Sequence, residues 1–186
     1  MKRLLILLLL IPTVSCAQDG KIISKKPLTI SDSIRTRLAE SVPQLDAIQF
    51  SKITYLSDGL KVTGYIAEPK KEGKYPCIIT NRGGNRDFGE WTPLSIAFFM
   101  GQMAQWGYVV VASQYRGNDG GEGIEQFGGD DLNDVLNLIP VLEQMPKSDT
   151  ARIGIEGGSR GGMMTYLAMK ESCRFKAAVV VAGVAD

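Results

Sequence analysis

A serine between glycines is the feature of this sequence best suited to chemistry. Ser159 stands in "GGSRG", residues 157–161, which fits the G-x-S-x-G pattern of a nucleophile elbow. In an elbow the serine occupies a strained turn between a strand and a helix, and the flanking glycines let the two backbones pass closely. The pattern therefore predicts an exposed nucleophile for acyl transfer. The alternative interpretation is a glycine-rich turn whose serine caps the helix.

Acyl transfer also needs hydrogen-bond donors for the charge that develops on the substrate oxygen. We expect one donor to be the backbone N–H of Arg160, because it follows the nucleophile at a helix N-terminus. We expect the other in "RGG", residues 82–84, where a substrate can approach the backbone, and we choose Gly83. A flexible loop before a helix is the alternative interpretation of residues 82–84.

Activation of Ser159 is the open question, because the 186 residues contain no histidine. A serine hydroxyl near neutral pH needs a group that takes its proton, and histidine is the usual one. Without that base we expect the chain as it stands not to turn over substrate.

The elements that must position Ser159 follow from the apolar pattern. From Tyr75 onward, continuous apolar strands alternate with helical segments, which predicts a mainly parallel sheet with helices on both faces. Ser159 lies between a predicted strand, residues 152–157, and a predicted helix, residues 160–170. In such a sheet, ligands bind at the carboxyl ends of the strands.

Other local signals define further elements. Asp58 and Gly59 predict a tight hairpin between two alternating strands. A helix is expected to begin at Thr92 and Pro93 and to end near Trp106. Another is expected to follow the acidic pair at residues 130–131, with a kink at a proline, Pro140.

The beginning of the chain has a different composition. Lys2, Arg3 and an apolar run over residues 4–14 are typical of a signal peptide, residues 1–17, cleaved after Ala17. The alternative is a lipoprotein signal that ends before Cys16, whose lipid would be the one expected membrane attachment. Either signal predicts an exported protein that is periplasmic, extracellular or on the outer surface.

The remaining chain is divided into two parts. Residues 18–47 are expected to form a linker, over residues 18–28, and a short helix that ends before Pro43. Residues 48–186 are expected to form an incomplete α/β catalytic domain, because the chain stops directly after an apolar strand.

Composition excludes several functions. With 44% hydrophobic and 22% charged residues the chain is globular, and a net charge of +1 gives no basic surface for nucleic acid. Nucleotide binding is not expected, because the glycine-rich residues 116–131 are acidic and lack the lysine of a phosphate loop. No cofactor is expected. No metal is expected either, because histidine is absent and the cysteines are far apart in sequence.

Ordered motifs over residues 48–186 resemble the prolyl oligopeptidase-like serine peptidases of the α/β-hydrolase superfamily. The motifs are "RGGN", "YRGNDGGEG", "FGGDDLNDV", "RIGIEGGSRGGMM" and "FKAAVVVAGVAD". The resemblance implies a three-layer α/β sandwich, truncated here after about the sixth strand. It also implies a serine, an aspartate and a histidine in that chain order, with Ser159 as nucleophile and Arg160 and Gly83 as oxyanion donors. The aspartate and histidine would follow strands that this chain lacks.

Two arginines are further candidates for the site. Arg82 stands where similar proteins commonly carry tyrosine or histidine, and we expect both Arg82 and Arg116 at the catalytic end of the sheet. They could bind a substrate carboxylate. The alternative is internal ion pairing with nearby acidic residues. Tyr115 and Asp134 are expected to be structural.

Three functions remain open from the sequence. The leading hypothesis is a serine peptidase acting on peptides. The alternatives are a hydrolase of small carboxylic esters on the same fold, and a non-catalytic exported binding protein.

Overall fold

The computed structural model describes residues 18–185. The predicted signal peptide, residues 1–17, and the lipidation candidate Cys16 lie outside the described residues. Within residues 18–185, no helix is long and apolar enough to cross a membrane.

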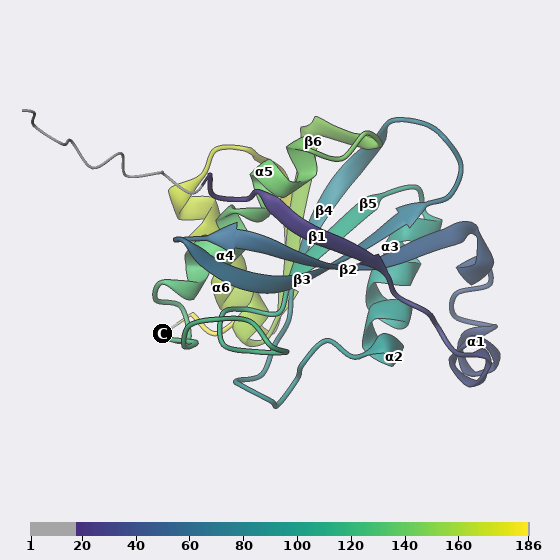
Figure 1. The fold of residues 1–186 in the computed structure, drawn as a ribbon, viewed down its shortest axis with the longest axis horizontal. Coiled ribbons are helices and arrows are strands. Elements are labelled where there is room, and N and C mark those ends of the chain that lie inside the picture. The colour runs from purple at the N-terminus through teal and green to yellow at the C-terminus, as the bar shows by residue number, and fades with distance from the viewer. Residues whose placement is uncertain (1–17, 186) are drawn as a thin grey trace, which may run out of the picture.

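The described residues form one seven-stranded sheet in the order β1-β2-β3-β5-β4-β6-β7 (Figure 1). The first three strands and the β3–β5 pair are antiparallel, whereas β5, β4, β6 and β7 are parallel. The strands are β1 (Ile22–Pro27), β2 (Ile48–Ser57), β3 (Leu60–Pro69), β4 (Tyr75–Asn81), β5 (Val109–Ser113), β6 (Ser148–Gly158) and β7 (Phe175–Val181).

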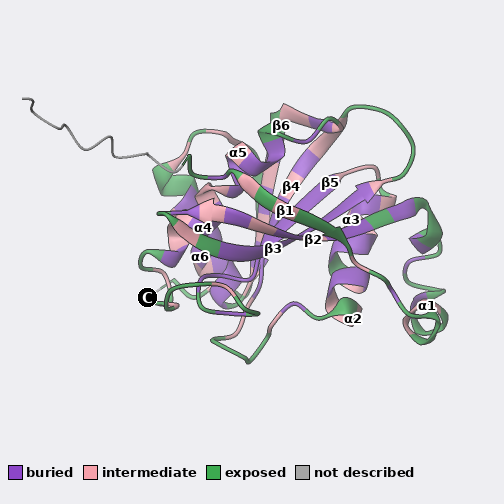
Figure 2. Ribbon diagram, viewed as in Figure 1, coloured by how far each residue is buried: buried purple, intermediate pink, exposed green. Residues whose placement is uncertain are grey.

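Helices cover both faces of the sheet, which confirms the predicted α/β sandwich. One apolar core contains side chains of α4, α5 and α6, and the other contains Ile96, Met100 and Ala104 from the opposite helical layer. Because both faces are covered, all five residues of β5 are buried. Figure 2 shows the buried residues gathered in the central strands. The helices of these layers are α2 (Pro93–Ser95), the π-helical turn η2 (Ile96–Met100), α3 (Gly101–Gln105), α4 (Asp131–Leu136), α5 (Leu138–Glu143) and α6 (Arg160–Glu171).

The predicted turns and helix ends are largely confirmed. Asp58 and Gly59 join β2 to β3 with φ values of 51° and 76°, the left-handed conformation that a two-residue hairpin needs. Thr92 caps α2 in a reciprocal capping box with Ser95. The π-helical turn within this helix was not predicted. Pro140 has no N–H to donate, and the predicted kink is a break between α4 and α5 at Asn137.

The linker predicted over residues 18–28 is wrong for most of its length. Residues Ile22–Pro27 form β1, which pairs antiparallel with β2. Four of the six residues of β1 are exposed, and its three polar residues follow one another, so the segment has no apolar alternation for sequence analysis to detect. Unpaired backbone groups at the edge of β2 are the reason that it becomes a strand. The short helix is present as α1 (Asp32–Leu38), followed by the 3₁₀ turn η1 (Leu45–Ala47).

Candidate active site

Ser159 occupies the sharp turn between β6 and α6. Its φ and ψ are 55° and −124°, a conformation that costs a non-glycine residue about 1–3 kcal/mol. The backbone is held firmly: its N–H donates to Val181 O over 2.9 Å, and its carbonyl accepts from the Gly162 N–H over 2.9 Å. The side chain is exposed and makes no capping hydrogen bond to α6. The geometry is therefore that of an elbow and not of a helix cap.

The glycines at both ends of the motif are required by close backbone packing. A Cβ on Gly157 would lie 2.2 Å from Gly161 O, and one on Gly161 would lie 2.0 Å from Asn81 O. Both contacts are with backbone, which cannot rotate away. Gly158 differs, because a Cβ there would meet only Val181 O, at 3.7 Å.

The two candidate oxyanion donors lie beside Ser159. In the parallel pair of β4 and β6, Asn81 is opposite Gly157, so the residues that follow these strands emerge at the same edge. A Cβ on Gly83 would lie 3.5 Å from the Ser159 Cβ. Arg160 is the first residue of α6, so the backbone N–H of Arg160 has no acceptor within the helix. The structure thus brings Gly83, Ser159 and Arg160 together, and their catalytic roles stay a prediction.

A pocket of about 430 Å³ opens next to these residues on the α2–α3 side of the sheet. Glu156 projects from β6 into it, and burial raises the pKa of this carboxyl, although a hydrogen bond from the Thr80 hydroxyl opposes the shift. Its lining includes Thr80, Asn81, Gly83, Trp91, Glu156 and Gly158.

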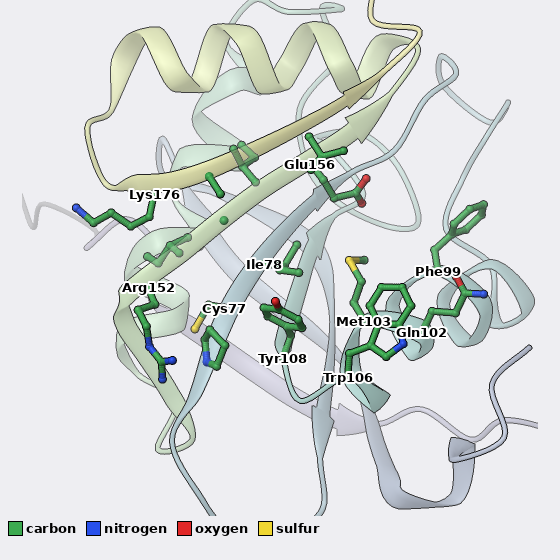
Figure 3. Close-up of a pocket in the computed structure, with 16 residues that line it drawn as sticks. Cys77, Ile78, Phe99, Gln102, Met103, Trp106, Tyr108, Arg152, Glu156 and Lys176 are labelled. Carbon is green, nitrogen blue, oxygen red and sulfur yellow. The ribbon is translucent and has the colours of Figure 1, made fainter.

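A larger pocket, of about 520 Å³, lies farther along the same face and has neither Gly83 nor Gly158 in its wall; Ser159 lines neither pocket. Figure 3 shows Glu156 on the side of the sheet that faces Phe99 and Met103 of the helical layer. Because Glu156 and Phe99 line both pockets, the two hollows adjoin. The smaller pocket is the better candidate for a substrate group, because it borders Gly83 and Gly158.

Neither arginine proposed to bind substrate is available to do so. The Arg116 side chain is 5% exposed, and its Nη2 lies 2.9 Å from Asp134 Oδ1 and 2.7 Å from Asp58 Oδ2. The Arg82 side chain is 2% exposed, with Nη2 3.0 Å from Glu125 Oε2. The two arginines therefore form internal ion pairs, and the interpretation that they bind a substrate carboxylate is not supported. Asp134 is structural, as expected.

Sequence analysis missed one residue of this region, Glu125. It lies in a glycine-rich segment with several acidic residues, and no spacing pattern singles it out. Its long-range pairing with Arg82 and Arg160 emerges only from the fold. Within residues 18–185 no cluster of His, Cys, Asp or Glu is arranged to hold a metal ion.

Comparison of the sequence with known proteins finds similarity to peptidases. Residues 95–186 match the prolyl oligopeptidase family, Peptidase_S9. The chain is 42% identical over 120 residues to the uncharacterized peptidase YtmA of Bacillus subtilis, covering 64% of this chain and 45% of YtmA.

Solved structures show the same relationship. The acylaminoacyl peptidase of Pyrococcus horikoshii matches with a TM-score of 0.63 and 28% identity, over 76% of this chain and 24% of the peptidase. The rice cell wall degrading esterase LipA of Xanthomonas oryzae matches with a TM-score of 0.66, over 87% of this chain and 49% of LipA; at 19% identity this likeness shows the fold alone. The chain spans less than half the length of each of these three proteins.

Proposed function

Residues 95–186 of this chain belong to the prolyl oligopeptidase family, and from this premise we propose that the chain carries the nucleophile of a serine peptidase. The observation that carries the proposal is the exposed Ser159 at a φ of 55°, with Gly83 beside it and Arg160 beginning the following helix.

In the proposed reaction Ser159 Oγ attacks the carbonyl carbon of a peptide bond and loses its proton to a general base. The C–O bond forms while the carbonyl electrons move onto oxygen, and the N–H groups of Gly83 and Arg160 donate to that oxygen. Collapse of the intermediate breaks the C–N bond, and the amine leaves with the proton. Water then hydrolyses the acyl-enzyme by the same route.

The 186 residues supply the nucleophile and both donors but contain no histidine. The proposal therefore takes its histidine base from outside these residues, and only the family's chain order of serine, aspartate and histidine places the aspartate there as well. One oxyanion donor typically contributes a factor of about 10²–10³ to kcat, so the geometry around Gly83 and Arg160 determines a large part of the rate.

A peptide substrate is favoured over an ester by the relatives of higher identity. YtmA is named a peptidase, and the Pyrococcus protein is an acylaminoacyl peptidase. The esterase neighbour is too distant in sequence to indicate a substrate.

The test is labelling of the full-length gene product with a fluorophosphonate, followed by mass spectrometry of the peptide that contains residue 159. We expect Ser159 to carry the label, Ser159→Ala to abolish hydrolysis of peptide p-nitroanilides, and Ser33→Ala, at an exposed serine of α1, to leave both unchanged. If Ser159 remained unlabelled, the proposal that it is the nucleophile of a serine hydrolase would be contradicted. If the protein hydrolyses p-nitrophenyl esters but does not cleave peptides, the proposed function becomes that of an esterase and not a peptidase.

We further propose that the protein is exported through residues 1–17, with cleavage after Ala17 or lipidation of Cys16. The support is the basic start and the short apolar run that follows it. Mass spectrometry of the mature N-terminus distinguishes the two forms, and an intact Met1 in the mature protein would contradict both.

A further inference from the structure

A buried carboxylate joins the two segments that carry the candidate oxyanion donors. The Glu125 side chain is 3% exposed and accepts hydrogen bonds from Arg82, just before Gly83, and from Arg160, just after Ser159. The Arg160 side chain is 1% exposed. A single side chain thus bridges the ends of β4 and β6.

Beside the Arg82 end of the bridge, Tyr115 orients the peptide whose N–H belongs to Gly83. The Tyr115 hydroxyl donates to Arg82 O over 3.1 Å. Because a trans peptide is planar, its carbonyl and its N–H point in opposite directions, so the Gly83 N–H is directed away from Tyr115.

The guanidinium of Arg82 also organises the loop that follows it. Arg82 donates to the carbonyl oxygens of Gly83 and Arg86, both over 3.2 Å, and the Arg86 N–H donates to Glu125 over 3.0 Å. The loop therefore closes around the Arg82–Glu125 pair.

The Arg160 end fixes the first turn of α6. The Arg160 guanidinium lies between two aromatic rings, with its Cζ 4.5 Å from the centroid of Tyr115 and 4.7 Å from that of Phe127. It also pairs with Asp131 and donates to Gly84 O over 3.2 Å. The helix start is thereby attached to the loop that contains Gly83.

The charges of this cluster balance. Two guanidinium groups, of Arg82 and Arg160, face two carboxylates, of Glu125 and Asp131. Burial raises the pKa of Glu125, but hydrogen bonds from the Arg86 N–H and from Arg160 outweigh it, so the pKa lies below its usual range. Glu125 is therefore ionised at neutral pH.

We propose that Glu125 is a positioning residue, which holds the N–H groups of Gly83 and Arg160 in the orientation that the oxyanion requires. The inference rests on the proposed function and extends it to a residue that does not touch substrate. Glutamine at this position keeps one acceptor oxygen but turns an NH₂ group toward one of the two guanidinium groups. Arg82 or Arg160 then loses its ion pair with residue 125, and the neighbouring donor N–H is no longer held by that contact.

The test compares Glu125→Gln with Asp134→Asn in the full-length protein. Asp134 is a matched control, because its buried carboxylate pairs with Arg116 and, within residues 18–185, makes no hydrogen bond or ion pair with residues 82–84 or 159–160. Two quantities are measured: kcat and KM for a peptide substrate, and Ki for a peptidyl trifluoromethyl ketone, whose hemiketal oxygen mimics the oxyanion.

We expect Glu125→Gln to lower kcat by about 10- to 100-fold, part of what a whole donor contributes, and to raise Ki by a similar factor with KM nearly unchanged. We expect Asp134→Asn to change kcat and Ki less than about threefold while lowering Tm, because it also breaks a buried pair.

A second variant covers the case in which Glu125→Gln does not fold. Glu125→Asp keeps the charge but shortens the reach, so it should give an intermediate loss of kcat with a matching rise in Ki. Folded Glu125 variants with wild-type kcat and Ki, or losses equal to those of Asp134→Asn, would overturn the positioning role alone. Activity retained by Ser159→Ala would instead overturn the proposed function.

Discussion

The substitution Gly161→Ala tests whether the elbow depends on backbone contact between α6 and β4. A Cβ at this position would lie 2.0 Å from Asn81 O, 2.7 Å from Asn81 C and 3.0 Å from Arg82 O. All three atoms are backbone, so the helix start and the strand end must separate by about 1 Å to reach an ordinary contact distance.

That separation affects stability and rate. Overpacking of this kind costs about 1–3 kcal/mol, which lowers Tm by roughly 3–10 °C in a domain of this size. Displacement of the reacting groups by about 1 Å lowers the rate by about 10²-fold. The fall in kcat/KM should therefore exceed what the loss of folded protein explains at the assay temperature.

The assay is thermal unfolding together with kcat/KM on a peptide substrate, in the full-length protein. Gly158→Ala is the matched control, because its Cβ would meet only Val181 O at 3.7 Å, and we expect its Tm to stay close to that of the wild type. Wild-type Tm and activity in Gly161→Ala would refute the reasoning, because the close approach of the two backbones would then not exist.

Two further substitutions test the supporting structure. Burial raises the folded-state pKa of Glu156, so its contribution to stability is full below the unfolded pKa of about 4.3 and is lost as pH rises through the higher folded value. Glu156→Gln should therefore gain Tm relative to wild type at pH 7.5 but not at pH 4, and an equal difference at both pH values would contradict this origin. Thr92→Ala should lower the free energy of unfolding by about 1 kcal/mol in urea titration, because it removes the capping box with Ser95. No change in the urea midpoint would show that this cap is dispensable.

The predictable features depend on neighbours in sequence. Gly157 is required by its contact with Gly161 within one strand–turn–helix unit, so a five-residue pattern reveals the elbow, although Gly161 itself packs against Asn81 of β4. Asp58 and Gly59 likewise specify their hairpin through their own left-handed conformations.

The features that escaped prediction depend on distant partners. Strand β1 forms because the edge of β2 is available, and its own sequence lacks the alternation of apolar and polar residues that would predict a strand. The inward direction of Arg82 depends on Glu125, 43 residues later in the chain. No local pattern shows which of several acidic residues will meet which arginine.

The left-handed conformation of Ser159 exposes the nucleophile but lowers the folding stability of the domain. The unfavourable backbone angles aim the hydroxyl outward, and every side chain with a Cβ bears the same penalty there. Glycine would relieve the strain but would discard the hydroxyl in the same step. Selection for a more durable protein must therefore act elsewhere in the domain, since this position offers no substitution that spares the nucleophile.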